Sequence, residues 1–131
     1  MRIAVDTNVI VRLFVDDDQP QTDRAAAAVD GRDLVSVSTV ALSEAVWVWR
    51  SVYRFRRGAV RAAVVSLLDL PRIAIDRAAV ASGLAFLDAG ADFADGVIAA
   101  EGRALGGEVF VSFDVRAVTA ATRNGLAART P

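Results

Sequence analysis

Carboxylates are the only side chains in this sequence that can readily support acid–base or metal chemistry. The 131 residues include 13 Asp and 3 Glu but no His, Cys or Lys, so all 15 positive charges are Arg. The chain therefore cannot form a Ser-His-Asp triad, a Cys-His pair, a thiolate–imidazole zinc site, a Walker A loop or a Schiff base. If it is an enzyme acting alone, carboxylates must do the work, through a cation that prefers oxygen ligands.

Four of these acids occupy positions that favour a shared site. Asp6 directly follows a short apolar run at 3–5, and Asp114 follows a later one. Glu44 and Asp95 have apolar neighbours at helical spacing, and a carboxylate on such a stripe is costly unless it is paired or bound to a cation. Because no Lys can pair with them, divalent cations would resolve the charge. Two such ions can hold the attacking and leaving oxygens of a phosphodiester displacement.

Apolar periodicity and turn residues predict strands and helices that alternate along the chain. We expect strands at 3–5, 34–37, 73–75 and 108–112, and helices at 8–15, 22–29, 40–55, 59–70, 77–87, 94–105 and 115–123. This order favours one α/β domain over 1–131, a three-layer sandwich with a mostly parallel central sheet flanked by helices. In such folds, sites gather beyond the carboxyl ends of the strands, where Asp6 and Asp114 lie.

Bulk composition sets further limits. Hydrophobic residues make up 54% and charged ones 24%, which is ordinary for a globular protein and excludes disorder. No apolar run reaches about 18 residues, and the first residues do not resemble a signal peptide, so we expect a cytoplasmic protein with no membrane partner. A net charge of −1 gives no global nucleic-acid signature. Contact with RNA or DNA would need a local basic patch or a metal.

Four short motifs resemble those of PIN domains, in the same order along the chain. They are Asp6-Thr7-Asn8-Val9-Ile10, Ser43-Glu44-Ala45, the stretch 92–100, and Ser112-Phe113-Asp114. With the total length, they are most similar to VapC-type toxins of bacterial toxin–antitoxin pairs. The resemblance implies an endoribonuclease that depends on Mg²⁺ or Mn²⁺, forms a homodimer and is neutralised by a cognate antitoxin.

The resemblance also implies roles for particular residues. The metal-binding and catalytic acids would be Asp6, Glu44, Asp95 and Asp114. Asp92 matches a further acid often found upstream of the third one, and Asn8 matches a polar residue that orients the first. Gly96 departs from the Ala more usual at its position, which would loosen the helix start without removing a ligand.

Each of these residues also has a purely structural interpretation. Asp6, Asp92 and Asp114 are well placed to cap helices, and the helix dipole would favour Asp95 in a first turn. Glu44 can be a solvated helix residue. Ser112 either supports the site or is only an edge hydroxyl. The ordered pattern favours a metal site, because otherwise all the structural interpretations would have to hold together.

The expected reaction is hydrolysis of RNA by a metal-bound water. Asp6, Asp95 and Asp114 would bind the metal directly, and Glu44 would do so through water or a second ion. Attack by water predicts 5′-phosphate and 3′-hydroxyl ends. Two alternatives remain, a catalytically inactive PIN-fold binding module and a PIN-type nuclease of nucleic-acid processing. A dehalogenase-like phosphatase and a receiver domain are disfavoured because both need a Lys.

The stretch 45–61 combines arginines with aromatic residues. Four arginines there would form one helical stripe if the helix continued through Gly58, which a glycine disfavours: Arg50, Arg54, Arg57 and Arg61. These arginines and Trp47 are candidates for contact with RNA or a protein partner, since Arg pairs well with phosphate and is enriched at interfaces. In the alternative interpretation Trp49 and Tyr53 are core residues and the arginines are a solvated face.

Overall fold

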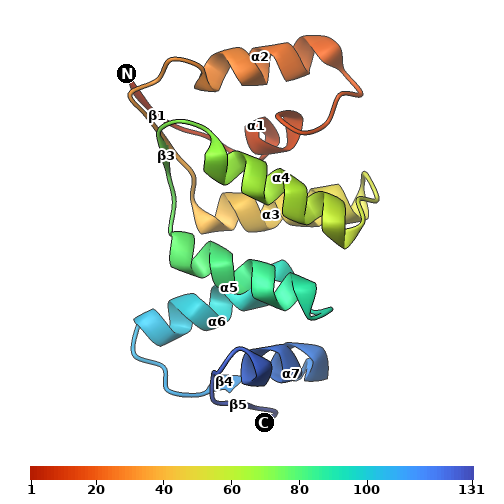
Figure 1. Cartoon of the computed structure of the whole chain (residues 1–131), viewed down its shortest axis with the longest axis vertical. Helices are drawn as coiled ribbons and strands as arrows, with labels where there is room; N and C mark the ends of the chain where they lie inside the picture. Colours follow the sequence, from red (N-terminus) through yellow and green to blue (C-terminus); the bar gives the residue numbers. More distant parts are fainter. The chain divides into compact units, whose positions relative to one another are not determined.

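The computed structural model describes residues 1–131 and divides into two compact units, residues 1–75 and 76–131. Helices predominate in both units, and every strand is only two or three residues long. Figure 1 shows the order of the elements along the chain. We describe each unit by itself.

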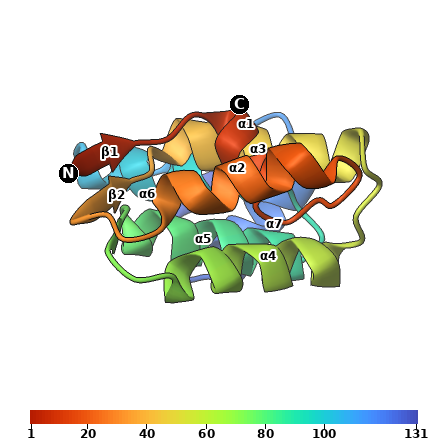
Figure 2. The same cartoon turned by 90° about the horizontal axis from the view of Figure 1, so that it is seen from above.

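The N-terminal unit is a parallel three-stranded sheet with four helices. Its elements in chain order are β1 (Arg2–Ala4), α1 (Thr7–Arg12), α2 (Gln19–Val29), β2 (Leu34–Ser36), α3 (Thr39–Ser51), α4 (Arg57–Asp69) and β3 (Ile73–Ala74). The strands pair in the order β1-β2-β3, with Val35 opposite both Ile3 and Ile73. Helix α1 packs against α2 and α3, as Figures 1 and 2 show. The parallel ladder brings the end of β1, and with it Asp6, to the same sheet edge as the start of α3.

Trp49 is the centre of the apolar core of this unit. Its side chain is fully buried. It meets the ring of Phe14 edge to face at 5.7 Å between centroids, and the ring of Phe55 stacks on it at 6.1 Å. The indole N–H donates to the carbonyl oxygen of Val11 at 3.4 Å, so the one polar atom of this large side chain has a partner. This burial agrees with the core interpretation of Trp49.

The predicted helix at 40–55 is too long, because α3 ends at Ser51. The chain folds back there: the Phe55 N–H donates to the carbonyl oxygen of Trp49 at 2.8 Å, and the Arg50 guanidinium donates to the carbonyl oxygen of Phe55 at 3.2 Å. Arg54 has a positive φ of 56° in this turn. Stacking of Phe55 on Trp49 therefore takes precedence over helix propensity.

The four arginines consequently do not form one helical stripe. Arg50 lies on α3, Arg54 in the turn, and Arg57 and Arg61 on α4. Gly58 is not the break, since it lies inside α4. The doubt about one continuous helix was justified, but the break lies between Ser51 and Arg57 and not at Gly58.

The C-terminal unit contains three helices and a two-stranded parallel ladder. In chain order it comprises α5 (Arg77–Asp88), α6 (Phe93–Ala104), β4 (Phe110–Val111), α7 (Val115–Arg123) and β5 (Ala128–Arg129). Phe110 of β4 lies opposite Ala128 of β5, a strand that the sequence pattern did not predict. Small residues of α7, with Phe86 and Ala99, form an apolar cluster under the ladder.

Helices α5 and α6 lie very close together where two glycines face the crossing. A Cβ on Gly83 would come within 2.7 Å of the ring of Phe93, and a Cβ on Gly96 would meet the backbone of α5. The Ser82 hydroxyl is buried at this crossing without a hydrogen-bond partner. The close approach fixes the first turn of α6, which carries Asp95, against α5.

The prediction of an α/β fold with parallel strands and flanking helices is confirmed. No helix in the structure is both long enough and apolar enough to cross a membrane.

Candidate metal centre

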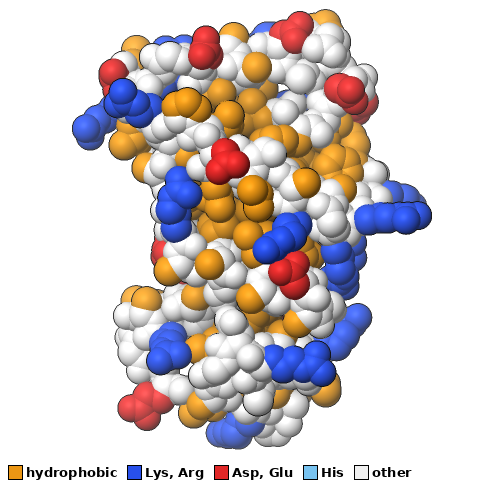
Figure 3. Space-filling model, in the orientation of Figure 1, with side chains coloured by type: hydrophobic (Ala, Val, Ile, Leu, Met, Phe, Trp, Pro, Cys, Tyr) orange, Lys and Arg blue, Asp and Glu red, His pale blue; other side chains and the backbone are white.

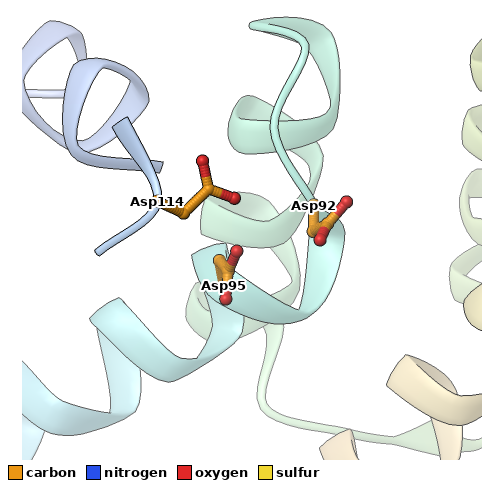
Figure 4. A group of neighbouring side chains, drawn as sticks. All are labelled: Asp92, Asp95 and Asp114. Carbon is orange, nitrogen blue, oxygen red and sulfur yellow. The ribbon is translucent and has the colours of Figure 1, made fainter. Parts of the chain in front are cut away.

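Three carboxylates of the C-terminal unit gather in one place. Asp92, Asp95 and Asp114 each offer an oxygen, and these oxygens lie within 4.8 Å of one another. Figure 4 shows the first two at the start of α6 and Asp114 just before α7. The starts of α6 and α7 thus meet at this point, although 18 residues lie between Asp95 and Asp114 in the sequence.

A short network of hydrogen bonds holds Asp114 in position. The Asp114 carboxylate is the N-cap of α7, and its Oδ1 accepts from the backbone N–H groups of Arg116 at 2.9 Å and Ala117 at 3.4 Å. Ser112 Oγ accepts from the Asp114 N–H at 3.0 Å. Capping therefore engages Oδ1 and leaves Oδ2 for a ligand, so the capping and metal interpretations of Asp114 are compatible. The Ser112 hydroxyl thus contacts the backbone of Asp114 and not its carboxylate.

Asp92 occupies the N-cap position of α6 but makes no side-chain capping hydrogen bond. A capping residue normally uses a side-chain oxygen to accept from an N–H of the first turn. The exposed carboxylate of Asp92 instead lies beside Asp95 and Asp114. Its geometry therefore favours a role in the acidic cluster over a role as a helix cap.

The surroundings of Asp95 favour the protonated form of its carboxyl group. Partial burial of the side chain raises its pKa, and the negative charges of Asp92 and Asp114 raise it further. Two unit charges 4.8 Å apart repel by about 3 kcal/mol at an effective dielectric constant near 20. None of the three carboxylates forms a salt bridge that would offset this repulsion.

The donor set of this cluster fits a hard divalent cation. All three donors are carboxylate oxygens, which Mg²⁺, Mn²⁺ and Ca²⁺ prefer. Ligand oxygens on opposite sides of one ion are about 4.2 Å apart for Mg²⁺ and about 5 Å apart for Ca²⁺. The 4.8 Å limit in the structure is close to that span. A bound cation would also remove the repulsion that raises the pKa of Asp95.

A second set of expected site residues lies in the N-terminal unit. Asp6 is the N-cap of α1, and its Oδ1 accepts from the Thr7 N–H at 2.7 Å. The Thr7 hydroxyl donates to Glu44 Oε2 on α3 at 2.9 Å. Thr7 thus contacts both carboxylates, through its backbone to Asp6 and through its side chain to Glu44.

Asn8 does not make the contact that the resemblance implies. It is exposed on α1, and the hydrogen bond to the Asp6 carboxylate comes from the Thr7 backbone instead. Sequence reasoning did not single out Thr7. A hydroxyl directly after a candidate metal ligand is the signal that could have identified it.

The expected contact residues are distributed over the surface of the N-terminal unit. Trp47 on α3 is 64% exposed, in contrast to the buried Trp49. One N–H group of the Arg50 guanidinium donates to the Phe55 carbonyl oxygen, so fewer of its donors remain for another partner. Figure 3 shows basic and acidic side chains interspersed on the visible face, which agrees with the net charge of −1.

Phe113 is a second residue that the sequence reasoning quoted without assigning a role. It lies between Ser112 and Asp114, and its side chain is 87% exposed. Burying a Phe side chain is normally worth about 1.5–3 kcal/mol, and Phe113 forgoes most of this gain beside the acidic cluster. A large apolar residue between two polar residues of one motif is the sequence feature that could have drawn attention to Phe113.

The comparisons with known proteins give one finding that bears on this geometry. A family model described as PIN domain matches residues 3–122. The match includes all five expected acids. No curated protein matches the chain.

Proposed function

The chain belongs to the PIN-domain family, and on that premise we propose that it is an endoribonuclease toxin that depends on Mg²⁺ or Mn²⁺. Members of this family are generally metal-dependent nucleases. The proposal adds a substrate, RNA, and a setting, neutralisation by a cognate antitoxin. It also includes a homodimer as the active assembly and one functional domain over 1–131.

The cluster of Asp92, Asp95 and Asp114 is the observation that supports this proposal most strongly. Three carboxylates that have no cationic partner repel one another, and a bound divalent cation would relieve this repulsion. When bound, a divalent cation would lower the pKa of a water molecule and offset the negative charge of a scissile phosphate. No other residue type in the chain supplies equivalent chemistry, because His, Cys and Lys are absent.

The role of the protein side chains would be to bind the cation from positions that hydrogen bonds hold in place. Asp95 and Asp114 Oδ2 are the main ligands, and Asp92 completes the set or holds a bound water. The capping bonds to Asp114 and the bond from its N–H to Ser112 keep that carboxylate oriented before substrate arrives. In the N-terminal unit, Asp6 and Glu44 are proposed to act on the same reaction, with Thr7 fixing the orientation of Glu44.

The exposed ring of Phe113 favours a single-stranded substrate. Proteins that bind unpaired strands use aromatic side chains on which bases stack, and this stacking tolerates many sequences. Phe113 adjoins Asp114, so a base on its ring would be close to the proposed cleavage position. RNA is the proposed substrate because its loops and ends offer unpaired bases.

Exposed apolar residues of α3 support the proposed role as a toxin with a protein partner. Val40 is 67% exposed and Trp47 64%, and they lie seven residues apart, on one face of the helix. Aromatic side chains are enriched at protein interfaces. We propose that the antitoxin binds this face and thereby silences cleavage.

Cleavage of a defined RNA, followed by mapping of its ends, tests the nuclease. The purified protein with Mg²⁺ or Mn²⁺ should produce 5′-phosphate and 3′-hydroxyl ends, and a chelator should stop the reaction. Asp95→Asn and Asp114→Asn should each lower kcat at least about a hundredfold, since each removes a ligand charge. Asp16→Asn, in an exposed turn, is the control with the same change in charge.

Several outcomes would contradict the proposal. Cleavage that survives Asp95→Asn and Asp114→Asn would exclude the cluster as the catalytic site. Products with 2′,3′-cyclic phosphate ends would exclude water as the nucleophile. Growth arrest that persists in both variants would favour a catalytically inactive binding module, and cleavage without any effect on growth would favour a processing nuclease.

Thermal unfolding gives a test of metal binding that does not depend on activity. A ligand at about 100 times its Kd stabilises a folded protein by about 2.7 kcal/mol. We expect Mn²⁺ to raise Tm by several degrees in the wild-type protein and in Asp16→Asn, but not in Asp95→Asn. Equal shifts in all three proteins would show that the ion does not bind at the cluster.

A further inference from the structure

A groove of about 630 Å³ opens on the C-terminal unit, along α6. One wall is the helix face with Ile98, Gly102 and Arg103. The other wall is formed by the segments 106–111 and 125–127. Its volume falls within the range of about 300–1,000 Å³ that is typical of small-molecule sites.

The groove begins beside the acidic cluster. Ile98 follows Asp95 by three residues on α6, so the two side chains are neighbours on the same helix face. On the opposite wall, Val111 ends β4 just three residues before Asp114. The three carboxylates do not line the groove, but its end at Ile98 lies about one helical turn from Asp95.

The lining of the groove suits a nucleoside. Four glycines leave its walls without side chains: Gly102, Gly106, Gly107 and Gly125. Near the carboxylates the walls are apolar, with Ile98 58% exposed and Val111 46% exposed. Flat, partly apolar bases pack well against such surfaces.

One cation and one anion complete the lining. Arg103 lies eight residues after Asp95, about 12 Å along the helix. Its guanidinium has no ion-pair partner in the structure and can bind a phosphate bidentately. Glu108 can accept a hydrogen bond from an amino group of a base or from a ribose hydroxyl.

We propose that this groove is a nucleotide subsite, which holds the unpaired nucleoside next to the scissile phosphate and binds its outer phosphate at Arg103. This inference rests on the proposed nuclease function and adds a binding position to it. The apolar walls receive the base, and Arg103 fixes the register of the strand relative to the acids. The subsite recognises an unpaired nucleotide, since a paired base would bring its partner strand into the walls.

Gly102 offers a substitution that fills the groove without disturbing the core. A Cβ built at this position meets no atom within 4 Å. Leu at position 102 would project into the groove, and Leu is also a better helix former than Gly. Gly58 on α4 is the matched control, because it too is a helical glycine with no atom within 4 Å of a Cβ.

The experiment combines these variants with an abasic scan. A single-stranded RNA with one mapped cleavage position is prepared as a series, each member lacking one base near that position. In the wild-type protein and in Gly58→Leu, one abasic position should raise KM by about five- to a hundredfold, with a smaller effect on kcat. Gly102→Leu should raise KM for the complete RNA by a similar factor. Removing the base at that same position should then raise the KM of Gly102→Leu no further.

Arg103→Gln provides a second readout. It should raise KM and reduce the dependence of KM on salt, because one phosphate contact is lost. Arg103→Lys should restore part of the affinity, since the charge returns without the bidentate geometry. Circular dichroism of each variant checks the fold, and if Gly102→Leu does not fold, the smaller Ile98→Ala replaces it in the same scan.

The outcomes separate this inference from the function on which it rests. If the wild-type protein cleaves no RNA, the nuclease itself is wrong. If it cleaves, but no abasic position matters or Gly102→Leu behaves like Gly58→Leu, the nucleotide subsite is wrong. If Gly102→Leu cleaves normally and loses its antitoxin, the groove belongs to a protein partner, which also overturns the inference.

Discussion

Gly96 on α6 and Ser82 on α5 approach so closely that a Cβ on Gly96 would lie 2.4 Å from the carbonyl oxygen of Ser82. The atom it would meet belongs to the backbone, so a side-chain rotation cannot relieve the clash. Gly96 follows Asp95 directly, and the helix crossing therefore controls where this carboxylate lies. The Gly at this position, where the resemblance favours Ala, permits a closer packing of α5 and α6.

We predict that Gly96→Ala destabilises the protein. Overpacking a close contact costs about 1–3 kcal/mol, and here the helices must separate to admit a methyl group. Gly102→Ala on the same helix is the control, because its Cβ enters open space and should stabilise the fold by about 0.5–1 kcal/mol. Urea unfolding measures both, and equal midpoints for the two variants would contradict the close crossing.

Protonation of Asp95 gives a predicted pH dependence of stability. Its pKa is raised in the folded state by burial and by Asp92 and Asp114. Between the unfolded pKa, near 3.9, and the higher folded value, the native state binds more protons than the unfolded state. The free energy of unfolding therefore falls as pH rises through this range, and the loss persists at neutral pH.

Asp95→Asn tests this dependence without metal. In the presence of a chelator the variant should be more stable than the wild type at pH 7, and the difference should shrink as pH approaches about 4. Equilibrium unfolding at a series of pH values measures it. The metal should reverse the order, since only the wild type binds it. A variant less stable than the wild type at pH 7 without metal would contradict the repulsion within the cluster.

Thr7 should control Glu44 through the hydrogen bond from its hydroxyl. Thr7→Val keeps the shape of the side chain but removes the donor to Oε2, which we expect to cost about 1 kcal/mol of stability. Because Glu44 loses its fixed orientation, kcat for RNA cleavage should fall more than KM changes. Thr7→Ser retains the hydroxyl and should recover most of kcat. No recovery would mean that the hydroxyl does not position Glu44.

Phe113 should contribute to RNA affinity but not to stability. Since its ring is 87% exposed, Phe113→Ala removes little buried area and should leave Tm within about one degree. Loss of one base–aromatic stack should weaken binding of a labelled single-stranded RNA by about 1–3 kcal/mol. Phe113→Trp should restore binding. Fluorescence anisotropy in Ca²⁺ measures the affinity, and unchanged binding by Phe113→Ala would exclude the stacking role.

The sequence predicts most helices because their boundaries depend on local signals. Asp114 caps α7 with side-chain hydrogen bonds, as its position indicated, and Asp76 caps α5 in the same way. Gly31 and Gly90 follow helices with positive φ, the conformation that glycine adopts most easily. The predicted helix at 115–123 matches α7 at both ends.

Tertiary contacts decide what the sequence could not predict. The stacking of Phe55 on Trp49 ends α3 at Ser51, although the residues after Ser51 suit a helix. The two-residue strand β5 forms only because β4 lies beside it. The proximity of Asp92 to Asp114, which is distant in sequence, likewise could not be predicted from local signals.

The two tryptophans of the chain lie two positions apart in opposite surroundings, one fully buried and the other 64% exposed. Their fluorescence therefore separates into two signals within the N-terminal unit. Emission from Trp49 reports whether the core is intact, and a solvent quencher should hardly reach it. Emission from Trp47 is open to quenching until something covers that face of α3. The protein thus contains its own optical probes, one for folding and one for occupancy of a surface.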